Sequence, residues 1–433
     1  MTAVSAPFDS AGTTSSGRMS AGRVLFASMV GTTIEFFDFY IYATAAVLVF
    51  PQLFFPGSDP TTATLESLAT FALAFFARPV GSALFGHFGD RIGRKATLVA
   101  ALLTMGVSTV VIGVLPTYAS IGIAAPVLLA LCRLGQGIGL GGEWGGAVLL
   151  ATEHAPAGKR AWFGMFPQLG APLGFLLATG TFLLMSATLD DAAFFAWGWR
   201  LPFLGSAVMV AIGLWIRLRI AETPAFQQVI DRRQRVRVPI LDVIVGHPRT
   251  LLAGTIGSIA TFLVFYLMSV FALSWGTSHL GYSRAQFLWM EMAAVLCFAG
   301  TIPLSALVTK RLGSRGAMLL ATIAILVFGI AFAPMFVAGN IAGTFVFLAI
   351  GMCLTGFTYG PIGTLLAEMF PTAVRYTGAS LCFNLSGILG ASLAPSIATW
   401  LATHLGLAWV GYYLSAAALL TLLALLAVRP EHD

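Results

Sequence analysis

The sequence predicts an all-α polytopic membrane protein, in which twelve transmembrane helices form two six-helix halves related by pseudo-symmetry. Two observations lead to this fold class. First, 58% of the residues are hydrophobic and only 9% are charged, with a mean hydropathy of +0.90, so the polar groups are too few to cover a soluble surface. Second, apolar stretches of about 20 residues, each long enough to cross a bilayer, recur along the whole chain.

The expected spans divide evenly around one long polar connector. They cover roughly residues 24–50, 65–85, 96–115, 121–152, 161–186, 199–220, 250–275, 285–309, 316–336, 341–367, 377–402 and 406–428. The expected domain organisation is a disordered tail over 1–20, a first bundle over 21–220, a connector over 221–249, a second bundle over 250–428 and a short tail over 429–433. The first tail has no apolar core followed by a small-residue cleavage site, which argues against a cleaved signal peptide.

Basic residues predict the orientation. In a twelve-span arrangement nearly all of them fall on one side, and only Arg200 and Arg284 fall on the other. This asymmetry places both termini in the cytoplasm, and it accounts for the net charge of +6 without nucleic acid. The connector holds four arginines, and it is either a solvated linker near anionic headgroups or a regulatory docking site: Arg232, Arg233, Arg235 and Arg237.

The two halves repeat one another. Glu153, Pro156 and Arg160 follow the fourth span, and Glu368, Pro371 and Arg375 recur at the same spacing after the tenth. Parallel repeats of this kind are known in transporters. A charged hairpin, GHFGDRIGRK, joins spans two and three. Its counterpart after span eight keeps Leu312, Gly313 and Arg315 but has Lys310 where the acid would stand.

Ionisable residues inside the spans are candidate functional groups, because each costs about 2.5–3.5 kcal/mol to insert at the bilayer centre. Asp38 and Arg133 fall at one depth near the midplane, so they are expected to pair as a coupling centre or, alternatively, as a fixed structural ion pair. Glu35 lies one turn from Asp38, and is either a second proton site or a residue that snorkels to the interface.

Other polar residues have weaker assignments. Arg78 precedes Pro79; it is either a helix-end residue that snorkels and neutralises the hairpin acid or a functional residue, and together with Arg133 it favours a carboxylate substrate. Glu291 has no evident basic partner in its half and is a candidate for a water-filled vestibule. The glycine-rich fourth span is expected to pack closely against spans one and five or, alternatively, to form an unwound segment that contacts the substrate. Candidate substrate ligands in or near the spans are Glu143, Trp144, Tyr266, Tyr359 and Asn384, together with Arg133.

The charged hairpin resembles the signature of the major facilitator superfamily, through Gly86, Asp90, Arg91, Gly93, Arg94 and Lys95. The segments EFFDFYIYATAA, RLGQGIGLGGEWGGA, WGWRLPF and EMFPTAVRYTGAS are similar to the metabolite:proton symporter branch, nearest to its shikimate-permease-like inner-membrane members. The resemblance covers nearly the whole chain. It implies alternating access, a hairpin that holds the cytoplasmic gate shut, and proton-coupled uptake of a small organic acid or zwitterion, such as shikimate, 2-oxoglutarate, citrate, proline or betaine.

Several classes of function are disfavoured. No G-x-x-x-x-G-K-S/T motif is present, so ATP coupling within the chain is not expected, and the spacing of the four cysteines suggests neither a metal nor a redox site.

The expected protein is a monomeric carrier and not an enzyme, without cofactor or metal. Its partners are a small-molecule substrate, protons and the lipid bilayer, and not nucleic acid. The alternatives are a proton-independent facilitator, an exporter, or a sensor that binds without transport.

Overall fold

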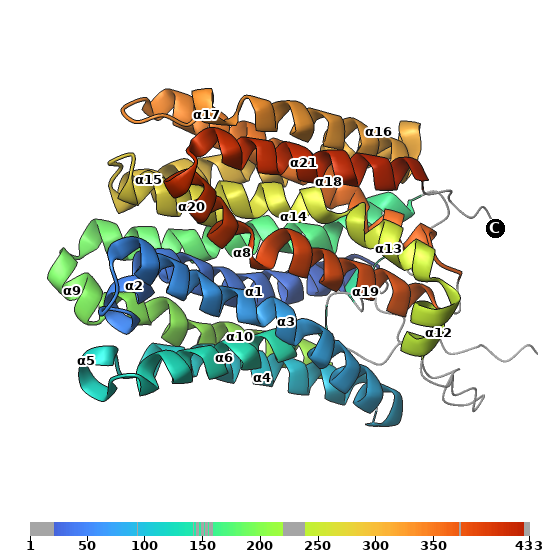
Figure 1. The fold of residues 1–433 in the computed structure, drawn as a ribbon. Coiled ribbons are helices and arrows are strands. Elements are labelled where there is room, and N and C mark those ends of the chain that lie inside the picture. The colour runs from blue at the N-terminus through green and yellow to red at the C-terminus, as the bar shows by residue number, and fades with distance from the viewer. Residues whose placement is uncertain are drawn as a thin grey trace, which may run out of the picture.

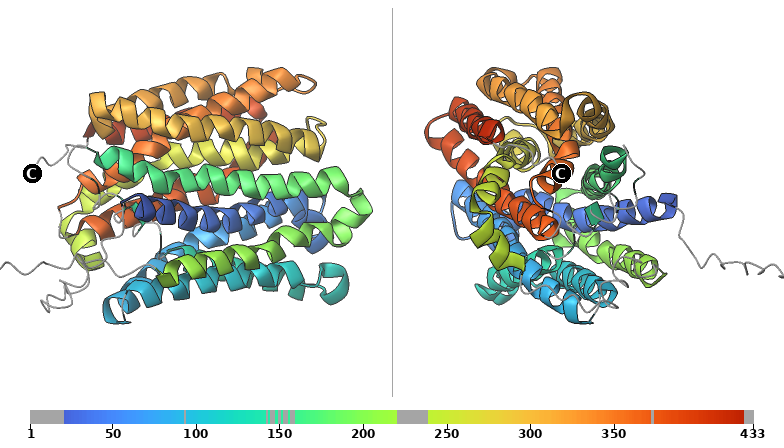
Figure 2. Two further views of the ribbon diagram at one scale, coloured as in Figure 1. Left: turned by 180° about the vertical axis from the view of Figure 1, so that it is seen from behind. Right: turned by 90° about the vertical axis from the view of Figure 1, so that its right-hand side faces the viewer.

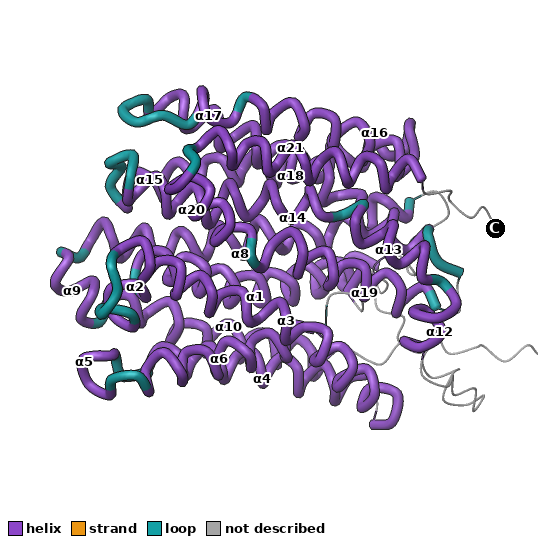
Figure 3. Tube along the Cα trace, viewed as in Figure 1, coloured by secondary structure: helices purple, strands orange, loops and turns teal. Residues whose placement is uncertain are grey.

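The computed structural model describes residues 21–92, 94–141, 143, 147–148, 151, 155, 159–219, 239–371 and 374–427. All regular structure in these ranges is helical, and the loops between the helices are short (Figure 3). The predicted tails 1–20 and 429–433 and residues 221–238 of the predicted connector lie outside the described residues.

Ten helical elements belong to the described residues of the first half. They are α1 (Ala21–Leu48), α2 (Phe50–Phe54), α3 (Pro60–Ile92), α4 (Arg94–Val114), α5 (Tyr118–Ile121), α6 (Ala124–Gly141), α8 (Arg160–Thr188), α9 (Asp191–Ala196), the 3-10 turn η1 (Gly198–Arg200) and α10 (Leu201–Arg219). Helix α3 begins after Asp59, whose carboxylate accepts from the backbone N–H groups of Thr61 and Thr62. Hydrogen bonds from Thr62 lower the pKa of Asp59.

The second half begins inside the predicted connector. Its elements are α12 (Pro239–Gly246), α13 (Pro248–Ile256), α14 (Ile259–Tyr266), the π turn η2 (Leu267–Phe271), α15 (Ala272–Ser278), α16 (Arg284–Ile330), α17 (Phe332–Met335), α18 (Ile341–Glu368), α19 (Arg375–Gly387), the π turn η3 (Ile388–Ser392), α20 (Ala394–His404) and α21 (Leu407–Ala427).

Helix α16 makes two passes of the bundle. It has 47 residues, so a straight helix would be about 70 Å long, more than twice the hydrocarbon thickness of a bilayer. The helix breaks at Gly313, which has φ 72° and ψ 167°, a conformation open to glycine. The residues on either side of α16 meet again, because the Tyr282 hydroxyl donates to the Val337 carbonyl oxygen at 3.2 Å. The predicted spans eight and nine are therefore the two arms of α16.

With α16 counted as two arms, the bundle has twelve passes. Nine helices within the described residues are long and apolar enough to span a membrane, with α16 counted once. The remaining passes are the second arm of α16, the shorter apolar segment Val99–Val114 in α4, and α1, which carries Glu35 and Asp38 near its middle. Pass seven consists of α13, α14, η2 and α15, and pass eleven of α19, η3 and α20.

The two halves lie side by side with their passes nearly parallel (Figure 1). Residues 21 and 427 lie at one end of the bundle, which we call the terminal face; α2, α5 and α9 lie at the other end, the far face (Figure 2). Between the halves, α8 packs on α16 and α18, while α3 packs on η3, α19 and α20. A site shared by the halves therefore lies between these two sets of contacts.

Close packing of α6 depends on its glycines, though not against the expected neighbours. A Cβ atom at Gly137 would meet the Ala77 Cβ at 2.8 Å, and one at Gly139 would meet the Met105 Cβ at 2.7 Å. These contacts are with α3 and α4, which are passes two and three. The prediction that the glycines pack against spans one and five is therefore wrong. Glycines of α8 fill that role instead, since Gly170 and Gly174 lie against α1.

Candidate functional site

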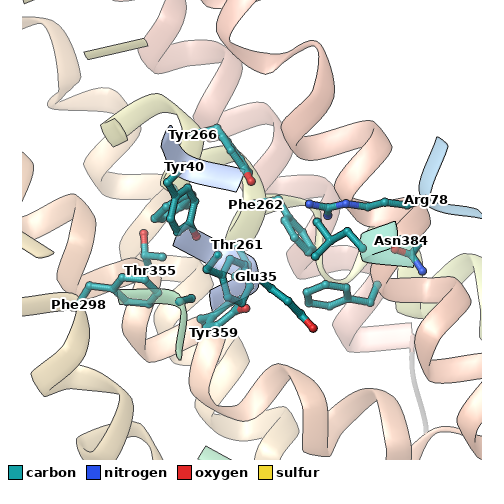
Figure 4. A pocket seen from close by; sticks show the side chains of 15 residues that line it. Glu35, Tyr40, Arg78, Thr261, Phe262, Tyr266, Phe298, Thr355, Tyr359 and Asn384 are labelled. Atoms are coloured by element: carbon teal, nitrogen blue, oxygen red, sulfur yellow. The ribbon is translucent and has the colours of Figure 1, made fainter. Parts of the chain in front are cut away.

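A cavity lies between the two halves and encloses about 600 Å³ of space not filled by atoms, with the open solvent at its mouth included. Both halves contribute to its wall, through α1, α3, α6 and α8 on one side and α14, α16, α18 and α19 on the other (Figure 4). The lining residues are Glu35, Phe36, Tyr40, Arg78, Leu140, Ala171, Thr261, Phe262, Phe265, Tyr266, Phe298, Thr355, Tyr359, Phe383 and Asn384.

Aromatic rings from the two halves meet around this cavity. Tyr266 of α14 lies 5.6 Å from the Phe75 ring of α3 and 5.7 Å from the Phe71 ring, measured between ring centroids. Tyr40 of α1 lies 5.5 Å from Phe265 of α14. Such edge and tilted contacts are favourable beyond the area they bury. The cavity is consequently a largely apolar chamber with few charged groups.

Arg78 is the cation of the cavity wall. Its guanidinium lies 4.4 Å from the Phe75 ring centroid and 4.8 Å from that of Phe39, and the side chain points into the cavity from α3 (Figure 4). The residue is 5% exposed, its Nε has no hydrogen-bond partner, and no carboxylate of the described residues forms an ion pair with it. A buried cation of this kind favours a bound anion.

Glu35 is the acidic residue of the cavity wall, and it belongs to a buried charge cluster. Arg217, near the end of α10, lies 3.5 Å from the Glu35 carboxylate and also pairs with Glu143, just beyond α6. The side chains of Glu35 and Glu143 are 2% and 6% exposed. We call these three residues the Arg217 cluster. Arg217 belongs to the basic residues whose distribution predicts the orientation, and the sequence analysis assigns it no place in a site.

Asp38 and Arg133 are fully buried but do not pair directly, so the predicted ion pair is wrong. Asp38 Oδ1 accepts from the Ser206 hydroxyl at 2.5 Å, and its Oδ2 has no partner. The Arg133 guanidinium lies over Tyr42 and Phe39, at 4.1 and 4.3 Å from their ring centroids. The depth of a residue along a helix can be predicted from the sequence. The orientation of a long side chain such as that of Arg133 depends on the aromatic rings against which it packs.

A polar chain runs from Arg133 to α4 instead. Arg133 Nη1 donates to the Gln136 side-chain oxygen at 2.9 Å, and Gln136 Nε2 donates to the Thr109 hydroxyl at 2.8 Å. The Thr109 hydroxyl donates in turn to the Met105 carbonyl oxygen at 2.9 Å. The chain therefore ends on the backbone of α4, outside the cavity wall.

Comparison with known proteins identifies the family. The chain is 57% identical over 412 residues to the inner membrane metabolite transport protein YhjE of Escherichia coli (strain K12), covering 94% of each chain. It belongs to the major facilitator superfamily. This superfamily member is also 34% identical over 417 residues to the shikimate transporter of the same strain, again covering 94% of each. The family described as "Sugar (and other) transporter" matches residues 24–238.

A solved structure shows the same fold. The D-xylose-proton symporter superposes on 95% of this transporter and 99% of its own chain, with a TM-score of 0.73 and 18% sequence identity. The twelve-helix fold predicted from the sequence is therefore confirmed, and so is the resemblance to the metabolite transporters. The relatives are transport proteins and not enzymes, as expected.

The predicted site residues of this transporter fall into three groups. Glu35, Tyr266, Tyr359 and Asn384 line the cavity, whereas Asp38, Arg133 and Glu143 are buried outside it. Their functional roles remain predictions. Nothing is described of Trp144, of Gly93, or of the side chains of the other hairpin residues, Gly86, Asp90, Arg91, Arg94 and Lys95.

Two further polar residues complete the comparison with the sequence. Arg78 is buried in the cavity wall, so the prediction that it snorkels from a helix end is wrong. Its position favours the alternative of a functional residue, which the sequence indicated by placing a guanidinium within an apolar span. Glu291 is 1% exposed, and its Oε1 has no partner among the described residues, but it does not line the cavity.

Proposed function

We propose that this transporter takes up a small organic acid across the bacterial inner membrane together with a proton, by alternating access of the cavity to the two sides. The superfamily supports solute transport, and the name of the YhjE relative supports the inner membrane. The observation that carries the choice of substrate is Arg78, a buried guanidinium in the cavity wall without an acidic partner among the described side chains.

The substrate carboxylate binds Arg78. A planar guanidinium holds a carboxylate through two parallel hydrogen bonds, which a ring surface alone cannot offer. Arg78 is the only arginine or lysine among the described residues that line the cavity, so the cavity suits one carboxylate better than two or three. The substrate is therefore a monocarboxylate, with an apolar skeleton against the aromatic rings.

Polar groups around Arg78 orient the rest of the substrate. The Tyr359 hydroxyl has no hydrogen-bond partner in the described part of the chain, and the Asn384 amide makes a long bond of 3.3 Å to the Ser82 hydroxyl. A substrate hydroxyl or amine satisfies such groups, and its absence leaves them buried without a partner. These two side chains supply selectivity, and Arg78 supplies most of the affinity.

Asp38 is the proton site. Its buried carboxylate has one oxygen on Ser206 and one without a partner, so a proton on the second oxygen removes a buried charge. Phe39, the next residue of α1, lies against the Arg133 guanidinium and also against that of Arg78. This ring connects the proton site to the cavity.

Contacts between the halves exist toward both faces, as alternating access requires. Gln168 of α8 donates to the Tyr359 carbonyl oxygen of α18 at 2.9 Å on the terminal side of the cavity. At the far face Arg284 of α16 pairs with Asp191 of α9. Breaking the contact between the halves at one face opens the cavity to that face. The excess of basic residues assigns the terminal face to the cytoplasm.

Two measurements test this function. A melting-temperature screen of the purified protein over organic acids identifies the ligand, because a ligand that binds only the folded state raises the melting temperature. Uptake of that acid into proteoliposomes with and without a pH gradient then separates the mechanisms. Accumulation that needs the gradient supports symport, while equilibration indifferent to it indicates a facilitator. Outward pumping indicates an exporter, and binding without counterflow a sensor.

A further inference from the structure

The Arg217 cluster carries one negative charge more than it can balance. Two carboxylates, Glu35 and Glu143, share one guanidinium, and all three side chains are largely buried. Two carboxylates on one buried site do not both remain charged without a further cation. Among the described side chains, no second cation contacts either carboxylate of the cluster.

Among the described side chains of the helices packed around Glu35, one further cation lines the same cavity. Helix α8, the most extensive neighbour of α1, has no charged side chain over 161–188. Helix α10 supplies Arg217, and α4 has basic residues only at its start. The titratable groups that line the cavity beside Glu35 are Arg78, Tyr40, Tyr266 and Tyr359. Arg78 is therefore the cation available to balance the cluster, and it acts across the cavity.

Substrate binding removes that balance. In the empty cavity, the charge of Arg78 offsets the excess negative charge of the Arg217 cluster, because Arg78 and Glu35 line the same chamber. A carboxylate bound to Arg78 neutralises the guanidinium. The cluster is then left with its uncompensated charge, and a proton from water in the cavity restores neutrality. Substrate and proton thus favour each other's binding, as reciprocal linkage requires.

We propose that the Arg217 cluster is a second proton-binding site, separate from Asp38, which takes up one proton when a carboxylate occupies Arg78. Glu35 and Glu143 hold this proton as a coupled pair on Arg217. Its coupling role rests on the proposed organic-acid transport. The site extends the path of the proton, since Glu35 lies one helical turn closer to the terminal face than Asp38.

Infrared spectroscopy tests the site without any substrate. The full-length protein is reconstituted in lipid, and the carboxylic-acid C=O band is followed as the pH is lowered. The wild type is expected to gain a band that both Glu35→Gln and Glu143→Gln remove, with no further loss in the double variant. Asp242→Asn, at an exposed carboxylate of α12, is the matched control and keeps this band. Melting temperatures establish that each variant is folded.

Arg78→Gln tests the balance across the cavity. Removal of its positive charge makes protonation of the cluster easier, so the band is expected to appear at a higher pH than in the wild type. A wild-type band in Glu143→Gln, or an unchanged midpoint pH in Arg78→Gln, would overturn the proposal. These readings do not involve transport, so they stand apart from any failure of the uptake assay that tests the proposed function.

Discussion

Two buried arginines stack on one phenylalanine, and their placement decides which residue meets the substrate. Phe39 lies 4.8 Å from the Arg78 guanidinium and 4.3 Å from that of Arg133. Only Arg78 lines the cavity. The sequence shows both as guanidiniums within apolar spans and ranks Arg133 first because of its depth. It does not show that the Arg133 side chain is enclosed by rings and Gln136.

Lysine substitutions at these two positions separate the roles. Arg78→Lys keeps the charge but loses the planar fork, so the affinity for the carboxylate is expected to fall by about tenfold or more, or about 1.4 kcal/mol. Arg133→Lys, the matched variant, is expected to change affinity by less than about twofold, because Arg133 does not line the cavity. Ligand-dependent melting shifts provide both dissociation constants. An equal loss of affinity in the two variants would indicate that Arg133 also binds the substrate.

Asp38→Asn tests the coupling residue. Asparagine fills the same space but binds no proton, so uptake driven by a pH gradient is expected to be lost while substrate exchange continues in part. The measurement compares uphill uptake with counterflow in the same proteoliposomes. Full uphill accumulation by the variant would place the essential proton elsewhere, with the Arg217 cluster as the next site to examine.

At the scale of the element, the glycine pattern of α6 predicts that the helix packs closely but not which helices it packs against. The density of glycine in this span indicates close packing, and the structure shows that packing at Gly137 and Gly139. The partners, α3 and α4, depend on how six helices are arranged around an axis, which no local pattern encodes. For the same reason the π turns η2 and η3 inside passes seven and eleven were not predicted from uniformly apolar stretches.

Gly137→Ala tests this packing. The added methyl group would meet the Ala74 Cα at 2.7 Å and the Ala77 Cβ at 2.8 Å, and overpacking of this kind costs about 1–3 kcal/mol. The melting temperature is expected to fall. The control is Gly205→Ala in α10, where nothing lies within 4 Å, so the better helix propensity should raise stability by about 0.5–1 kcal/mol. A loss at both glycines would show that backbone flexibility, and not space, is what α6 requires.

The hairpin between α3 and α4 allows a prediction from sequence alone. Asp90 is expected to meet the positive end of α19, which begins at Arg375, so Asp90→Ala should remove about 0.3–1 kcal/mol from the closed cytoplasmic side. In the second half Ser314 bonds Glu368, a different connection beside Gly313. Labelling of cysteines placed in the cytoplasmic half of the cavity should rise in the variant. Unchanged labelling with normal transport would leave the hairpin a determinant of topology only.

At the scale of the whole molecule, the sequence predicted the architecture and part of the site. Hydropathy, basic-residue asymmetry and the repeat of Glu153 as Glu368 are properties of the chain itself, and they were sufficient for twelve passes in two halves. The cavity arises only where the halves meet. Tyr266, Tyr359 and Asn384 could be suggested as wall residues because polar groups in apolar spans are uncommon, whereas the contact of Arg217 with both Glu35 and Glu143 required the three-dimensional packing of three helices.

The central claim is that a carboxylate on Arg78 moves inward with protons. The most direct measurement is the uptake of a radiolabelled monocarboxylate, the one identified by the melting screen, into proteoliposomes that contain the wild type or Arg78→Gln. The pH is acidic outside the proteoliposomes and neutral inside. The wild type should accumulate the acid above its external concentration and lose this accumulation when the gradient is collapsed. Asp242→Asn, at an exposed carboxylate of α12 away from the cavity, should match the wild type, whereas Arg78→Gln should show no accumulation. Accumulation by Arg78→Gln equal to the wild type, or accumulation that survives collapse of the gradient, would contradict the account.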